Sequence, residues 1–166
     1  MNNLRLSIFT ALILANSHSF ATKDILIPKF SDFRVNLKAS YPQTKLNTDS
    51  KLTKRFKTML SSYLDAGPNF AGEYALASWG CGSSCLRHAI INVQNGRTFW
   101  PKEIEATFNL LSCSKDTLYF QSASKLLIVN KKHEDDQIEQ TYMIWEKSRF
   151  KLVTKRVIRE KDFCKE

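Results

Sequence analysis

The chain has 166 residues, of which 43% are hydrophobic, and its 25 basic and 16 acidic residues give a formal net charge of +9. This size fits one ordinary domain with a sizeable core. No apolar stretch reaches the roughly 20 residues that a membrane span needs. The basic balance favours anionic partners such as envelope lipids, acidic polymers or acidic proteins, or else it keeps the surface well solvated.

Residues 1–21 have the three parts of a secretory signal peptide. Arg5 supplies a positive start, an apolar run extends from Leu6 to Ala15, and small residues stand at the two recognition positions before the expected cut after Ala21. The run of about ten residues is too short to span a membrane, and an uncleaved apolar helix is the alternative. We therefore expect a single domain over residues 22–166, exported to the periplasm or secreted.

One amphipathic helix is predicted over Asp49–Leu64, because its apolar residues form a single stripe. Asp49 or Ser50 can cap its start, and Gly67 and Pro68 mark its end. We expect the helix to cover one face of a sheet. Before it, the chain is irregular, with one short strand expected near Phe33–Leu37. The apolar stripe consists of Leu52, Phe56, Met59, Leu60, Tyr63 and Leu64.

After the helix, apolar and polar residues alternate as they do in strands. Asn95-Gly96 predicts a tight two-residue hairpin turn. Ile104–Leu111 is either a short helix or an extended connector, and Lys131–Gln140 is expected to be a charged, exposed loop. The whole pattern predicts an α+β fold, with the helix packed on one meandering antiparallel sheet stapled by disulfides. The expected strands are 74–79, 88–93, 98–100, 117–121, 125–130, 141–146 and 150–157.

Four cysteines follow the expected cleavage site, and an even count in an exported chain predicts two disulfides. We favour Cys81–Cys85 with Cys113–Cys164, because a bridge within the short loop only needs its Cα atoms to come within about 7 Å. The alternative connects Cys81 or Cys85 to Cys113. Zinc is disfavoured because Cys113 and Cys164 are not a close pair. No metal and no cofactor are expected.

Cys81 and Cys85 are separated by three residues, Gly82-Ser83-Ser84, whereas redox dithiols usually have two and sit at a helix N-terminus. Serine catalysis at Ser83 or Ser84 is disfavoured, because the second Gly of a nucleophile elbow is missing. The acidic run 134–139 lacks the central Gly of a calcium loop. No catalytic residue is assigned, and a stapled turn between two strands is the favoured interpretation.

The stretch 68–85, which contains Asn69-Phe70-Ala71-Gly72-Glu73-Tyr74 and Trp79-Gly80-Cys81-Gly82-Ser83-Ser84-Cys85, resembles a signature of small exported proteins of Gram-negative bacteria. Ser124–Val129 and Tyr142–Trp145 resemble later strands of that family, so the resemblance covers residues 68–153. It implies kinship and export, but it implies no activity, because none is established for the family. Where those proteins often have His, this chain has Glu73, which puts a shared catalytic role there in doubt.

The favoured function is a non-enzymatic binding protein, of an inhibitor or immunity type, that presents the stapled loop 79–88 to a protein. The first alternative is a thiol–disulfide enzyme using Cys81 and Cys85. The second is an accessory protein that binds anionic envelope lipid or polymer through its basic C-terminal segment; nucleic acid is the least expected partner. The candidate loop residues are Trp79, Gly82, Ser83, Ser84, Arg87 and His88, and the candidate anion-binding residues are Arg149, Lys151, Lys155, Arg156 and Arg159.

Overall fold

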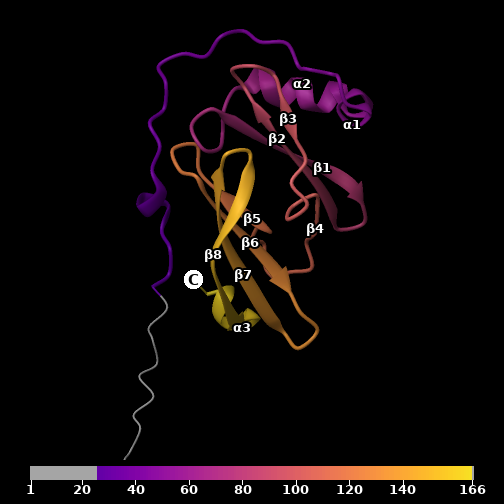
Figure 1. Ribbon diagram of the computed structural model, residues 1–166. Coiled ribbons are helices and arrows are strands. Elements are labelled where there is room, and N and C mark those ends of the chain that lie inside the picture. Colours follow the sequence, from indigo (N-terminus) through magenta and orange to yellow (C-terminus); the bar gives the residue numbers. More distant parts are fainter. Residues whose placement is uncertain (1–25, 166) are drawn as a thin grey trace, which may run out of the picture.

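The computed structural model describes residues 26–165, so the expected signal peptide and its cleavage site lie outside the described residues. The fold is mostly β, with short helices (Figure 1). One antiparallel sheet contains β1 (Tyr74–Gly82), β2 (Cys85–Asn92), β3 (Thr98–Phe99) and β4 (Ala106–Phe108). The other contains β5 (Leu118–Phe120), β6 (Leu126–Lys132), β7 (Gln137–Glu146) and β8 (Arg149–Arg159). The helices are η1 (Phe30–Phe33), α1 (Lys51–Arg55), α2 (Lys57–Ala66) and α3 (Glu160–Phe163).

Three hydrophobic clusters hold these elements together in layers. The largest lies between the two sheets and joins Leu76 and Ile90 of the first sheet to Leu127 and Trp145 of the second. Another packs the opposite face of the first sheet against α2, and the third packs the outer face of the second sheet against η1. Residues 34–50, between η1 and α1, form an extended segment that runs along one side of the molecule, and we call this segment the strap (Figure 1).

The predicted helix forms, but it is divided in two. Ser50 caps α1 by accepting a hydrogen bond from the Thr53 backbone N–H at 3.0 Å. At Phe56 the backbone leaves helical geometry, with φ −107° and ψ 20°, and α2 then continues to Ala66. The Phe56 ring lies 5.1 Å from that of Trp79. Periodicity cannot reveal such a one-residue break, because the same stripe of residues faces the sheet on both sides of it.

The prediction of a single meandering sheet was wrong, because the strands divide into two stacked sheets. The expected strand near residues 33–37 is instead η1 followed by one isolated bridge from Arg34 to Ser124. Most of the expected loop 131–140 is paired strand, with only residues 133–136 between β6 and β7. Within the ambiguous stretch 104–111 lies β4, which pairs with β2.

The hairpin at Asn95-Gly96 forms with a longer turn than predicted. Asn92 pairs with Arg97 through a backbone hydrogen bond of 2.9 Å, so four residues form the loop. Gly96 has a φ of +68°, and a Cβ atom there would lie 2.1 Å from the Lys45 carbonyl oxygen. Glycine is therefore required here both by the left-handed backbone and by the strap packed against it.

Candidate functional site

The stretch Trp79–Cys85 forms the stapled end of the β1–β2 hairpin. The strands pair in regular register from Tyr74 with Asn92 to Gly80 with Leu86, then shift at the bulge before Gly82 and Cys85. A disulfide joins Cys81 to Cys85, whose Cα atoms are 5.1 Å apart. Gly82 at φ +141° and Ser84 at φ +55° supply the left-handed backbone of the turn. The predicted stapled turn and the favoured connectivity are both confirmed.

The second disulfide joins Cys113 to Cys164 across 51 residues and fixes α3 to the loop before β5. Beside it, the buried Glu160 carboxylate accepts hydrogen bonds from the Ser112 backbone N–H at 2.7 Å and from the Lys132 amine at 2.6 Å. The bond from Lys132 holds the pKa of Glu160 below its usual value, and the pKa of Lys132 is raised in turn. Two disulfides are consistent with a location outside the cytoplasm.

Two large apolar side chains lie beside the stapled turn, and no motif in the sequence marks either of them as part of a site. Phe108 on β4 is the pairing partner of Cys85, and the backbone N–H of Asn109 donates to the Ser84 carbonyl at 2.8 Å. Phe108 is 56% exposed and Leu110 is 58% exposed. We call Gly80–Ser84 together with Phe108–Leu110 the tip surface. On β4 the usual orientation of strand side chains is reversed, because the polar Thr107 is buried and the apolar Phe108 is exposed.

Three of the six candidate loop residues, Trp79, Arg87 and His88, are not part of this surface, which corrects the sequence-based expectation. Trp79 is only 9% exposed and packs against Phe56 and Trp100, because alternation along β1 turns it towards α2. Arg87 is half-buried above the Phe56 ring, 5.6 Å from its centroid, and lies 3.8 Å from Glu105. Gly82, Ser83 and Ser84 are exposed.

His88 is also interior, and the structure corrects its place in the candidate loop. It is 1% exposed, and its Nδ1 and Nε2 atoms lie 2.7 Å from Ser78 Oγ and 2.8 Å from Thr107 Oγ1. Burial lowers the pKa of His88 from 6.5 to about 4, so the ring is neutral at pH 7. A Ser–His pair resembles a nucleophile and its base, but a hydroxyl stands where a catalytic triad has a carboxylate. The group therefore serves as a polar bridge inside the fold.

Three of the five candidate anion-binding residues have a side-chain partner within the chain. Lys155 pairs with Glu139 at 2.9 Å and Arg159 pairs with Asp162 at 2.8 Å, while Arg156 donates to the Gln140 side chain. Arg149 and Lys151 are exposed, and their side chains have no partner within residues 26–165. Two adjacent free cations are a weaker anion site than the five that the sequence suggested.

Among the residues that the structure describes, no helix has the length and apolarity needed to cross a membrane. No group of three or more His, Cys, Asp and Glu side chains within residues 26–165 is placed to hold a metal ion. Comparisons of the chain with known protein families, with curated proteins and with solved structures found no match.

Proposed function

We propose that the chain is a non-enzymatic binding protein of the periplasm or the extracellular space, and that its tip surface inserts into a recess on a partner protein. The observation that carries the proposal is the exposure of Phe108 and Leu110 beside a covalently closed turn. Kinship with the small exported proteins that share the Asn69–Cys85 signature is part of this proposal.

A stapled turn suits recognition because its geometry is set before the partner arrives. The disulfide and the bond from Asn109 to Ser84 restrict the backbone, so less conformational entropy is lost on binding. Phe108 and Leu110 supply the buried apolar anchors that dominate many interfaces, and the open backbone of 80–84 supplies polar contacts around them. A partner of neutral or acidic surface fits best, since the basic chain would repel a basic one.

The two alternatives have less physical support. Cys81 lies near the end of β1 and Cys85 begins β2, so neither is at a helix N-terminus that would lower the pKa of a thiol, and the two are joined as a disulfide. Of the five candidate anion-binding residues, internal pairing leaves only Arg149 and Lys151 exposed and without side-chain partners within the described residues. Binding through them would weaken steeply with salt, whereas apolar insertion of the tip surface would not.

The test is a crosslinking pull-down from whole cell envelopes with three forms of the protein as bait. The tip variant carries Phe108→Ser and Leu110→Ser. The matched control carries Leu152→Ser and Val157→Ser, which remove two equally exposed apolar side chains from β8 of the other sheet. Loss of a central apolar anchor costs about 2 kcal/mol or more, or about thirtyfold in affinity.

We therefore expect a partner that the wild type and the control capture and the tip variant does not. The partner should remain bound in high salt. If the tip variant and the control capture every partner equally well, the tip surface is not the recognition site.

A further inference from the structure

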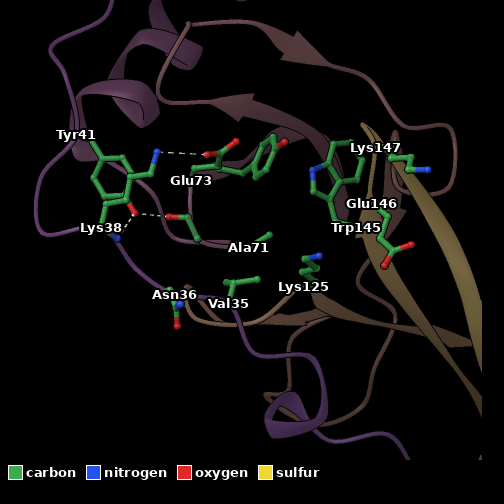
Figure 2. A pocket seen from close by; sticks show the side chains of 12 residues that line it. Val35, Asn36, Lys38, Tyr41, Ala71, Glu73, Lys125, Trp145, Glu146 and Lys147 are labelled. Carbon is green, nitrogen blue, oxygen red and sulfur yellow. Dashed lines mark hydrogen bonds and ion pairs between the residues drawn. The ribbon is translucent and has the colours of Figure 1, made fainter.

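A second candidate site lies away from the tip surface, in a cavity of about 460 Å³. Figure 2 shows its walls, which come from the strap at Val35–Tyr41, the turn Ala71–Tyr74, Lys125 just before β6, and Trp145–Lys147 at and just after the end of β7. Small-molecule sites commonly have volumes of about 300–1,000 Å³. The size is that of a site for a small metabolite.

The turn that forms one wall is fixed by contacts on both sides. Ala71 and Gly72 have φ values of +48° and +82°, and the Gly72 backbone N–H donates to the Ser122 carbonyl at 2.7 Å. On the other side, the Tyr41 hydroxyl donates to the Gly72 carbonyl at 2.5 Å. A Cβ atom at Gly72 would lie 3.2 Å from Val35. The cavity is thus built by rigid backbone and is formed before any ligand binds.

The indole N–H of Trp145 is the unusual group in this cavity. Trp145 is 3% exposed, and its Nε1 atom has no hydrogen-bond partner within residues 26–165. Figure 2 shows this nitrogen on the edge of the ring that faces the pocket. The ring cannot easily turn away, because Tyr74, Phe99 and Phe150 hold it in edge contacts at 4.9–5.6 Å. A buried donor without an acceptor is costly, so the site calls for an acceptor from outside the chain.

The charges around the indole indicate which acceptor it is. The amine of Lys125 points towards the same space in Figure 2 and has no ion-pair partner within the described residues. Glu73 is already occupied, because it accepts from Asn92 at 2.9 Å and from Gln94, and lies 3.9 Å from Lys38. Lys147 also lines the pocket without an ion-pair partner within the described residues, and the Glu146 carboxylate in the same lining offsets its charge. The indole donor and the Lys125 ammonium therefore match a singly charged acceptor. A phosphate dianion would meet the carboxylates of Glu73 and Glu146, which also line the pocket.

We propose that this pocket binds a small organic carboxylate. The ligand's carboxylate accepts the hydrogen bond of Trp145 Nε1 and pairs with the Lys125 amine, and the rest of the ligand lies against Ala71 and Val35. A free amino acid and the C-terminus of a short peptide present the same group. This site is separate from the tip surface, and neither proposal depends on the other.

The test is a titration of the ¹⁵N-labelled protein followed through its three tryptophan indole signals. The probes are N-acetylalanine, N-acetylphenylalanine, free phenylalanine and the tripeptide Gly-Gly-Phe, with N-acetylphenylalanine amide and inorganic phosphate as controls. At least one carboxylate should move a single indole signal downfield and saturably, with a Kd of about 1 mM or tighter. The amide and phosphate should not. The free amino acid and the tripeptide distinguish the two sources of the carboxylate.

Variants connect the signal to the site. Trp145→Phe should remove the shifting signal and weaken binding at least tenfold, and Lys125→Gln should weaken it at least tenfold. Lys102→Gln, at an exposed lysine outside the pocket, should bind as the wild type does. If Trp145→Phe does not fold, the proposal is tested by the affinity of Lys125→Gln and by the response of the wild type to N-acetylphenylalanine amide.

Three results would each overturn the proposal: no carboxylate moves an indole signal saturably, phosphate binds as well as the carboxylates, or Lys125→Gln keeps full affinity. The tip variant should bind the carboxylate normally, so failure here is distinguishable from failure of the tip surface.

Discussion

Acidification should weaken the fold through His88, and the size of the effect follows from its burial. The pKa of His88 is about 4 in the folded protein and 6.5 for an exposed histidine. Between these values the unfolded chain binds a proton that the folded protein does not, so stability falls as the pH falls. The two pKa values differ by about 2.5, and each pKa unit corresponds to about 1.4 kcal/mol. The free energy of unfolding should therefore fall by about 3 kcal/mol between pH 7 and pH 4.

Urea unfolding of the wild type and of His88→Gln at several pH values measures this contribution. Glutamine does not titrate, so the stability advantage of the wild type over the variant should shrink by about 3 kcal/mol between pH 7 and pH 4. Carboxylates with lowered pKa values, such as Glu160, also reduce the stability of the protein in acid. Because they are present in both proteins, their contribution cancels in the comparison. His133→Gln, at an exposed turn, should behave like the wild type.

A stability advantage that stays constant across this range would refute the argument. If His88→Gln does not fold, the imidazole signals of the wild type decide, because His88 should remain neutral down to about pH 5. Protonation of His88 near pH 6.5 in the folded protein would refute the argument equally.

Two further predictions concern the framework, and both are measured as free energies of unfolding. Replacing Cys113 and Cys164 by Ser should cost about 4 kcal/mol, because the bond closes a loop with a sequence separation of 51; a cost below about 1 kcal/mol would contradict this. Gly96→Ala should destabilise by more than about 2 kcal/mol, because it adds a clash with the Lys45 carbonyl to the left-handed strain. Gly80→Ala, where a Cβ atom meets nothing within 4 Å, is the matched control and should change stability by less than half as much.

Several strands and the stapled turn could be predicted from the sequence, because each depends on a pattern of neighbouring residues. Alternation located β6, β8 and the second half of β7, and the glycines and cysteines of 80–85 predicted the stapled turn that the structure contains. Alternation does not say which strands share a sheet, so the division into two sheets was missed. The short β4 was also missed, since three residues carry too little pattern to separate a strand from a connector.

The site was harder to predict than the fold, because it depends on contacts between distant segments. The same alternation that groups Trp79 with Ala75 and Ala77 already turns it away from the loop surface, but only the packing of Phe56 shows that it is buried. His88 is polar, so its burial follows only from the hydroxyls that Ser78 and Thr107 bring to it. The exposure of Phe108 has no sequence signal, since apolar residues in strands usually point inward.

The Cys113–Cys164 bond encloses the whole of the second sheet, from β5 to β8, in one covalent ring. The turn at His133–Asp136 lies inside that ring and is exposed. A protease that cuts the chain there would therefore leave the two pieces tethered, with all four strands still able to pair. Cleavage would become visible as separate fragments only after a reductant opens the ring, so a single cut at this turn would leave the second sheet covalently connected.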